Sequence, residues 1–590
     1  MKTPRTAIRY TLHVTSYKLR FLLVVVERSR NTAFFFSALL LFCFSAYGQN
    51  PNCYRITFSD KNNSPYSIGR PEEFLSPRAI AKRERFNIPV TEQDLPVNPQ
   101  YIEAILNFSH EPSQIISKSK WDNSVVIFYP ETESCHGIIS DMLNHLSFVI
   151  DTLPVAYYKL PFRTEEFSKE KEIYQPQTSN SMLSSSCDYD YGKSIDNIKL
   201  HKGELLHKAG FCGEGMLIGV FDSSWRGYDT ISFFKPLYEN GQIWGTRDLV
   251  YGINNIYEMG SGHGTFTTSI MASAVEGKLI GTAPKANYFF IRVNSPLDCE
   301  QLILEDLWAY ASEIADSLGV DVVNSSQGYT TFDYDWQNIY LPADNDGKTS
   351  IASRAASTLA QKGIVLVNSA GNEAKTNWKY IIRPADAGNI LAVGAVTMNG
   401  EAASWSSYGY SSDGRVKPDV AALGEQVWAI NSAGKIVKFP VGGTSSAAPI
   451  IAGLSACLWQ ALPQYSAIEV MNLIRQYGDQ ANNPDDRKGY GIPDFYQCYL
   501  DHYIGVHENE KPEVSVYPNP TTGQLRITNY ELRILEVEVF DVFGRKQKAE
   551  SRRQKAEGEV VVDISTLQAG VYFVRILTEK GVVNKKIIKY

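Results

Sequence analysis

The chain has 590 residues, 44% of them hydrophobic, a length that predicts about three to four domains with cores of ordinary size. Its 57 basic and 64 acidic residues give a formal net charge of −7 and are spread along the chain without a long basic block. We therefore expect no nucleic-acid partner.

The first 48 residues have the pattern of a secretory signal with a long leading segment. Two arginines precede an apolar run over residues 33–44, and small residues frame a cleavage site before Gln49. A membrane anchor is the alternative, but the run is shorter than the roughly 20 apolar residues that span a bilayer. We expect removal of residues 1–48 and no stable membrane span.

Eight cysteines occur, and seven remain once Cys43 leaves with the signal. An odd count in an oxidising compartment predicts one or more disulfides and at least one free thiol. Their spacing does not fix the connectivity, and no Cys or His cluster indicates a metal site.

Residues 49–187 combine strand-like and helical stretches. Alternation over residues 54–58 predicts a strand, and Ser76 followed by proline predicts a capped helix through Phe86. The polar, Ser-rich stretch at 175–186 predicts an exposed processing site, with an ordinary linker as the alternative.

Residues 188–505 alternate between short apolar runs and longer helical stretches. Strands are expected near 216–221, 288–293, 320–324, 364–368 and 390–396, and helices near 301–318 and 353–362. This alternation predicts an α/β domain with a mostly parallel sheet covered by helices on both faces. Such sheets place their sites at the carboxyl ends of strands.

Three side chains in this region have complementary chemistry. Asp222 ends an apolar strand, His263 stands between two glycines before a helical run at 266–275, and Ser445 follows two glycines at a helix start. Serine needs a base to take its proton, and the base needs an acid to fix its tautomer. Taken alone Ser445 would be an ordinary helix cap; with the other two it is a candidate nucleophile.

In this order the three motifs resemble those of the subtilases, which are subtilisin-like serine peptidases. The matching stretches are the strand end at Asp222, the His-Gly-Thr beginning at His263, and Gly-Thr-Ser-Ser-Ala-Ala-Pro at 443–449. The resemblance implies that Ser445 attacks a peptide carbonyl, that His263 takes and returns the proton, and that Asp222 orients His263.

Two further stretches match this family. Residues 365–373 form an apolar strand ending in Ala-Gly-Asn, and the resemblance implies that Asn372 donates its amide to the oxyanion; alone, such an Asn is a turn former. Residues 320–328 resemble the substrate-binding strand, whose backbone pairs with an extended peptide. Ser326 and Gly328 would line the pocket wall.

The chain departs from the family pattern at three positions near these motifs. Ser224, Phe266 and Ser446 stand where the family commonly has Gly, a second His and Met. None of these changes removes a proton-transferring group, so they bear on substrate preference. The alternatives are an inactive surface protein that binds peptides, and an esterase or acyl-transferring hydrolase. We expect no catalytic cofactor; structural calcium is frequent in the family but has no ligand pattern here.

Residues 49–187 resemble the amino-terminal propeptide of a branch of bacterial subtilases. The matching stretches are Phe-Leu-Ser-Pro-Arg-Ala at 74–79 and Asp-Leu-Pro-Val-Asn at 94–98. The resemblance implies a segment that assists folding and blocks the cleft of the precursor.

Residues 506–590 contain short alternating strands separated by Pro, Asn and Gly turns, which predict a small antiparallel all-β sandwich. The segment resembles the carboxy-terminal sorting domain of the type IX secretion pathway at 516–520, 539–541, 563–565, 570–572 and 585–589. The resemblance implies passage through the periplasm and outer membrane by that machinery, then release or surface attachment. A carbohydrate-binding or adhesive sandwich is the alternative. We therefore expect a secreted or cell-surface serine endopeptidase that acts on polypeptides.

Overall fold

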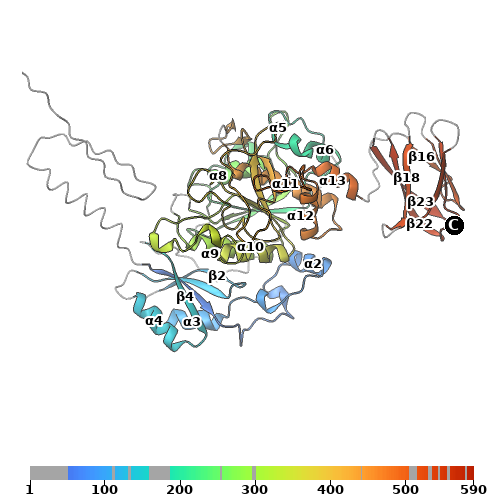
Figure 1. Ribbon diagram of the computed structural model, residues 1–590. Coiled ribbons are helices and arrows are strands. Elements are labelled where there is room, and N and C mark those ends of the chain that lie inside the picture. Colours follow the sequence, from blue (N-terminus) through green and yellow to red (C-terminus); the bar gives the residue numbers. More distant parts are fainter. Residues whose placement is uncertain are drawn as a thin grey trace, which may run out of the picture.

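A computed structural model describes most of the chain as three units: an amino-terminal sheet, a central α/β domain and a carboxy-terminal sandwich (Figure 1). The described residues are 51–108, 113–130, 135–158, 187–252, 255–295, 300–439, 442–503, 514–528, 534–541, 545–553, 559–578 and 581–590. The predicted signal and the predicted processing stretch at 175–186 lie outside these residues. Within them, no helix combines the length and apolar character needed to cross a membrane.

The amino-terminal unit is a four-stranded antiparallel sheet in the order β2-β3-β1-β4. Its elements are β1 (Cys53–Phe58), α2 (Pro77–Arg85), α3 (Pro99–Phe108), β2 (Gln114–Ser119), β3 (Ser124–Phe128), α4 (Cys135–His145) and β4 (Val149–Ala156). The predicted strand and the predicted helix are confirmed, and the Ser76 side chain accepts from Ala79 N as the cap.

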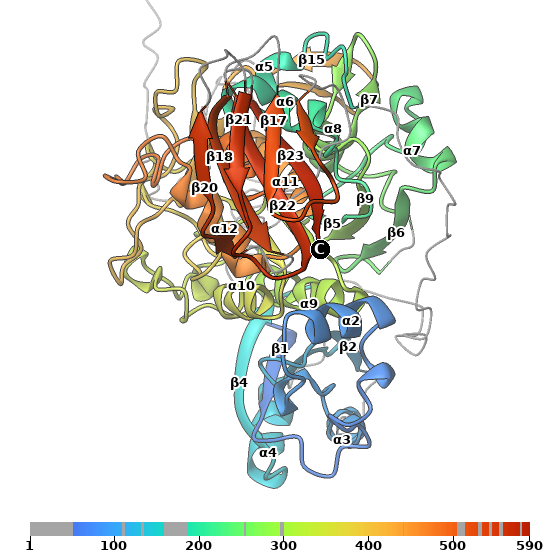
Figure 2. The same ribbon diagram turned by 90° about the vertical axis from the view of Figure 1, so that its right-hand side faces the viewer.

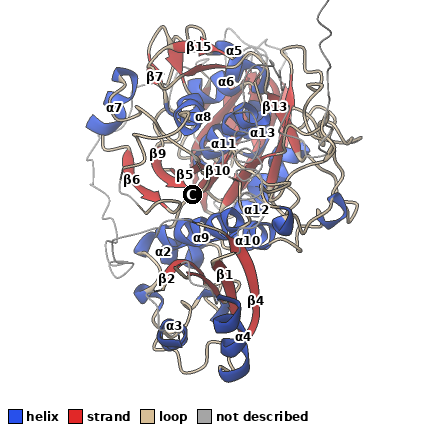
Figure 3. Cartoon of the chain, turned by 90° about the vertical axis from the view of Figure 1, so that its left-hand side faces the viewer, coloured by secondary structure: helices blue, strands red, loops and turns tan. Residues whose placement is uncertain are grey.

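Successive residues of this sheet serve opposite faces, as the two-residue repeat of a strand requires. Val125 and Ile127 belong to a core shared with α3 and α4, whereas Val126 and Phe128 join the core of the central domain. The amino-terminal unit therefore has a core of its own and presses its second face against α9 and α10 of the central domain (Figure 3).

The central domain contains a seven-stranded parallel sheet in the order β13-β12-β11-β10-β5-β9-β6. Its strands are β5 (Leu217–Asp222), β6 (Ile243–Asp248), β9 (Asn287–Arg292), β10 (Val322–Ser325), β11 (Val365–Ser369), β12 (Leu391–Val396) and β13 (Val420–Leu423). Most are buried along their whole length, which explains why they read as continuous apolar runs. Strand β5 lies between β9 and β10, so the residues that follow these three strands meet at one edge.

Helices cover both faces of this sheet, as predicted. The longer ones are α8 (His263–Ala272), α9 (Ile303–Leu318), α10 (Ile351–Gln361), α11 (Thr444–Ala461), α12 (Ala467–Gln476) and α13 (Phe495–His502). Short elements complete the domain: α5 (Ile195–Ile198), α6 (Gly203–Lys208), α7 (Lys235–Glu239), β7 (Ala274–Val275), β8 (Leu279–Ile280), β14 (Trp428–Ile430) and β15 (Ile436–Lys438). Helix α8 begins at His263, three residues before the expected start, because Gly262 adopts a left-handed conformation (φ 82°) that turns the chain directly into the helix.

The carboxy-terminal unit is an antiparallel sandwich, as predicted (Figure 2). Its two four-stranded sheets have the orders β16-β17-β21-β20 and β19-β18-β22-β23. The strands are β16 (Ser515–Tyr517), β17 (Gln524–Thr528), β18 (Ile534–Asp541), β19 (Lys546–Gln547), β20 (Glu550–Arg553), β21 (Glu559–Asp563), β22 (Gly570–Thr578) and β23 (Gly581–Lys589). Leu525 and Ile527 of one sheet and Val574 and Ile576 of the other fill its separate core.

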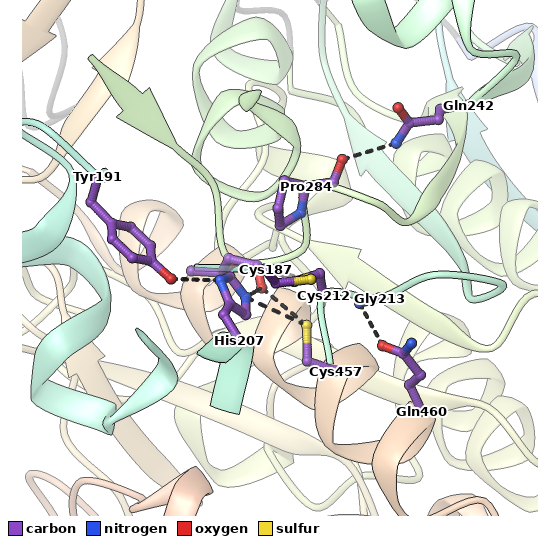
Figure 4. The surroundings of a disulfide bond; sticks show 10 residues. Cys187, Tyr191, His207, Cys212, Gly213, Gln242, Pro284, Cys457 and Gln460 are labelled. Carbon is purple, nitrogen blue, oxygen red and sulfur yellow. Dashed lines mark hydrogen bonds between the residues drawn. A yellow bond between two sulfur atoms is a disulfide. The ribbon is translucent and has the colours of Figure 1, made fainter. Parts of the chain in front are cut away.

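A disulfide joins Cys187, the last residue of the expected propeptide, to Cys212 near the start of the central domain (Figure 4). Beside it, buried His207 accepts a hydrogen bond from Tyr191 Oη at its Nδ1 (2.8 Å) and donates from Nε2 to a backbone carbonyl. The neighbouring thiol of Cys457 is free, and burial raises its pKa well above the usual range. The structure thus confirms one disulfide and a free, unreactive thiol.

Candidate active site

Asp222 and His263 form a hydrogen-bonded pair at the carboxyl end of β5. Asp222 Oδ1 accepts from His263 Nδ1 at 2.7 Å, and Oδ2 accepts from Thr267 Oγ1 at 2.8 Å. The carboxylate is fully buried, whereas 32% of the imidazole surface is exposed. The acid is therefore shielded from water while the ring stays accessible to a substrate.

Two opposing effects act on the proton affinity of His263. Burial of the ring lowers its pKa, but the negative charge of Asp222 and the hydrogen bond to it more than offset this, so the pKa of His263 is raised above its ordinary value. A His that keeps one nitrogen bonded to a carboxylate has the tautomer in which the other nitrogen can accept a proton.

The segment that precedes α8 is held tightly against the residues after Asp222. Ser224 Oγ accepts from Gly262 N at 2.8 Å, and Ser224 O accepts from Gly264 N at 2.7 Å. A Cβ at Gly264 would lie 2.7 Å from Ser224 O, so only glycine permits this approach. Ser224, a departure from the family pattern, thus fixes the loop that positions His263.

Ser445 lies in the first turn of α11 and contacts the end of β10. Its Oγ donates to Ser326 O at 3.4 Å, and Ser326 Oγ donates back to Ser445 O at 3.2 Å. The glycine turn before the helix is required, since Gly442 has φ +56° and a Cβ there would lie 1.6 Å from Gly424 O. The structure therefore brings Ser445 next to Ser326. In this arrangement the Ser445 hydroxyl is bonded to Ser326 and not to His263.

Asn372 follows β11 and faces the same helix start. Its Oδ1 accepts from Thr444 N (2.9 Å) and Thr444 Oγ1 (3.1 Å), which directs Nδ2 away from these donors. A Cβ built on Gly443 would lie 3.4 Å from Asn372 Nδ2 and 3.7 Å from Ser445 N. Two N–H donors thus face one small space beside Gly443, an arrangement suited to an oxyanion.

Gly328 lies at the wall of this region rather than beside the nucleophile. A Cβ there would lie 2.3 Å from Ile382 Cδ1, so the position has no room for a side chain. The next residue, Tyr329, exchanges backbone hydrogen bonds with Arg383. Ser326 and Gly328 therefore frame one strand end whose backbone is fixed on both sides.

The structure adds a polar side chain that sequence reasoning missed. Gln327 Nε2 donates to Asp222 Oδ1 at 3.1 Å, and Asn294 Nδ2 donates to Gln327 Oε1 at 2.7 Å. Gln327 lies between the two residues proposed to line the substrate-binding strand. A polar residue inside the stretch that resembles the substrate-binding strand was the available signal.

Phe266, the second departure from the family pattern, packs one turn beyond His263. Its ring lies 4.2 Å from that of Phe439, which is 37% exposed. This pair places an apolar surface beside the imidazole. Among the described residues, no three His, Cys, Asp or Glu side chains gather in a way that could hold a metal ion.

Comparisons with known proteins agree on three regions. Residues 213–491 match the subtilase family, residues 53–171 match the peptidase S8 propeptide domain of Bacteroidota, and residues 515–590 match the secretion system C-terminal sorting domain.

Individual relatives are distant. Serine protease AprX of Bacillus subtilis (strain 168) is 25% identical over 54% of this chain and 72% of its own length. Subtilisin NAT of Bacillus subtilis subsp. natto is 23% identical over 64% of this chain and 90% of its own. The crystal structure of MycP1 from Mycobacterium smegmatis is 19% identical over 56% of this chain and 91% of that one, with a TM-score of 0.40, which is too low to support the fold described above.

The family match and the serine protease relatives identify the central domain as a protease. The flanking matches identify a propeptide domain before it and a sorting domain after it. The chain is a serine-type endopeptidase with a subtilase-family protease domain, preceded by a propeptide domain and followed by a sorting domain for type IX secretion to the cell surface or the extracellular space.

Proposed function

We propose that Asp222, His263 and Ser445 are the catalytic triad of this endopeptidase and that Asn372 is its oxyanion donor. The observation that supports this most is the 2.7 Å bond between buried Asp222 and His263. A second observation is that Ser445 bonds to Ser326 while the adjacent Gln327 bonds to Asp222. The residues that follow β10 therefore contact both the acid and the nucleophile.

Acylation begins when Ser445 Oγ turns from Ser326 O toward His263 and attacks the carbonyl carbon of the scissile peptide bond. His263 Nε2 takes the hydroxyl proton, and Asp222 stabilises the imidazolium that forms. The tetrahedral oxyanion accepts hydrogen bonds from Ser445 N and Asn372 Nδ2. When the intermediate collapses, His263 gives the proton to the leaving amine and an acyl-enzyme remains.

Deacylation repeats these steps with water as the nucleophile. His263 takes a proton from the water, the new tetrahedral intermediate collapses, and Ser445 Oγ recovers the proton as the carboxylic acid product leaves. The substrate is a polypeptide lying extended along Ser326 and Gly328, where backbone pairing gives affinity that depends little on sequence. This chemistry uses side chains and one backbone N–H of the chain, with water as the second nucleophile, and we propose no catalytic cofactor.

The precursor is divided into a signal peptide at 1–48, a propeptide at 49–187, the protease at 188–505 and the sorting domain at 506–590. The sorting domain engages the type IX machinery after the chain reaches the periplasm, and the protease crosses the outer membrane to its destination. The match of residues 515–590 to a sorting domain supports this route.

The test compares Ser445→Ala with Ser446→Ala, a matched control at the neighbouring serine. We expect Ser445→Ala to abolish both cleavage of a denatured protein and labelling by a fluorophosphonate probe, and Ser446→Ala to retain both. Cleavage at the parent rate by Ser445→Ala would refute the assignment. A parent that takes up no probe would favour the inactive peptide-binding alternative, and a strong preference for esters over peptides would favour the esterase.

A further inference from the structure

We propose that Gln327, held in place by Asn294, is a positioning residue that acts on His263 through Asp222. This inference rests on the proposed triad and extends it by two side chains. They form a hydrogen-bonded series that runs from Asn294 to Gln327 and then to the catalytic carboxylate.

Sheet order explains why these residues meet. Strand β5, which ends at Asp222, lies between β9 and β10, and Asp222 is in register with Arg292 of β9. Asn294 comes two residues after the end of β9, and Gln327 comes two residues after the end of β10. Parallel strands deliver the residues that follow them to the same edge, so Gln327 reaches Asp222 from one neighbouring strand and Asn294 reaches Gln327 from the other.

The hydrogen bonds fix which way the Gln327 amide points. Asn294 Nδ2 can only donate, so it selects the orientation in which Gln327 Oε1 accepts and Nε2 faces Asp222. The reverse orientation would set a carbonyl oxygen against a carboxylate. Gln327 is only 8% exposed, so water has little access to its side-chain amide. Its backbone carbonyl accepts from Asn368 Nδ2 at 3.1 Å, which holds the backbone in place.

The donated bond changes how strongly Asp222 holds a proton on His263. Gln327 Nε2, His263 Nδ1 and Ser223 N all donate to the same oxygen, Asp222 Oδ1. An additional side-chain donor on that oxygen draws away negative charge that would otherwise stabilise the imidazolium. Gln327 therefore keeps His263 unprotonated, and able to act as a base, at lower pH than Asp222 alone would allow.

Asp222 is the charged group that acts on the proton affinity of His263 in the part of the chain that the structure describes. Arg292, which is in register with Asp222 on the neighbouring strand, is paired with Asp248, and α8 contributes Phe266 near the imidazole. Besides His263 and Gln327, the described donors to Asp222 are the backbone N–H and the hydroxyl of Ser223 and the hydroxyl of Thr267. The effect of a change at residue 327 can therefore be measured as a shift in the pH at which His263 is half protonated.

The experiment measures kcat and KM against pH for the mature enzyme made from the full chain, with active sites counted by fluorophosphonate labelling. For Gln327→Leu we expect the acidic half-point of kcat/KM to rise by about half a pH unit or more and kcat to fall by about tenfold, the loss typical of one hydrogen bond to a charged group, with KM within about twofold. The control is Gln242→Leu, which removes the two hydrogen bonds donated and the one accepted by the side chain of a glutamine just before β6, remote from the triad, and should leave the half-point in place.

A double-mutant cycle tests whether Asn294 acts through Gln327. Asn294→Leu should shift the half-point in the same direction by a smaller amount and should add nothing in the Gln327→Leu background. If Gln327→Leu does not fold, the shift of the half-point in Asn294→Leu tests the inference by itself. An unchanged half-point in both variants, or a change in KM alone, would overturn the inference. If Ser445→Ala stayed active, the proposed triad would have failed instead, so the two failures are distinguishable.

Discussion

The contact between the propeptide and the protease depends on acidic side chains of α9, among which Asp316 forms ion pairs with two basic side chains of the propeptide. Its two carboxylate oxygens accept from Arg83 Nη2 of the propeptide at 2.8 and 2.9 Å, and Oδ2 also accepts from Lys120 Nζ at 3.1 Å. The three side chains are only 2%, 3% and 8% exposed, respectively. We predict that Asp316→Asn weakens propeptide binding strongly.

The magnitude follows from burial. An exposed ion pair contributes about 0–1 kcal/mol, whereas removing one partner of a buried pair costs about 3–5 kcal/mol when the other charge stays buried without compensation. Arg83 keeps its bond to Asp94 of the propeptide, so we expect the lower end of that range. At about 1.4 kcal/mol for each factor of ten, the inhibition constant of the propeptide should rise roughly 10²-fold. Because the pair is buried, moderate salt should change this difference little.

The assay titrates separately produced residues 49–186, which have a core of their own and leave Cys187 with the protease, against mature protease with and without Asp316→Asn. The control is Glu239→Gln, which breaks the exposed Lys235–Glu239 pair and should alter inhibition by less than threefold. Inhibition of the Asp316→Asn enzyme within threefold of the parent would show that the buried pair does not determine docking.

Three further predictions concern the protease domain. Replacing both Cys187 and Cys212 by Ser removes a cross-link over 25 residues, which should cost about 3.5 kcal/mol and lower Tm by about 5 °C for a domain of this size; calorimetry showing a shift below 1 °C would contradict this. The raised pKa of His263 means that kcat/KM should fall as pH drops, with a half-point above the ordinary value of about 6.5, and Asp222→Asn should move that half-point downward; an upward move would contradict the role of the carboxylate. Gly442→Ala should remove activity toward a peptide substrate, because its Cβ would lie 1.6 Å from a backbone oxygen, and a fully active variant would show that this turn does not position the nucleophile.

The sequence motifs predicted most of the site because each lies at a strand end or a helix start. Apolar runs indicated five of the seven strands of the central sheet but not β6, which is only partly buried, or β13, which has four residues. The glycines around His263 and before Ser445 indicated where the backbone must approach closely. The bond between Gln327 and Asp222 could not be predicted in this way. It joins side chains that follow different strands, so it depends on the order of strands in the sheet.

The acidic residues of α9 illustrate a second limit. Asp306, Glu313 and Asp316 have the pattern of a solvated helix face, yet they are 3%, 5% and 2% exposed. They are buried because Arg55, Lys120 and their neighbours come from a separate unit more than 180 residues earlier in the chain. Burial of that face raises the pKa of Glu313 to about 7, an effect that no local pattern indicates.

The position of the disulfide decides what remains once the precursor is cut. Both of its cysteines lie after residues 159–186, so scission anywhere in that stretch leaves no covalent tether to the amino-terminal unit. The severed unit can then leave and return, and the fraction of enzyme that is open at any moment should depend on dilution. At high concentration the secreted enzyme would stay largely inhibited until the propeptide is degraded, whereas after dilution it would become active when the propeptide dissociates.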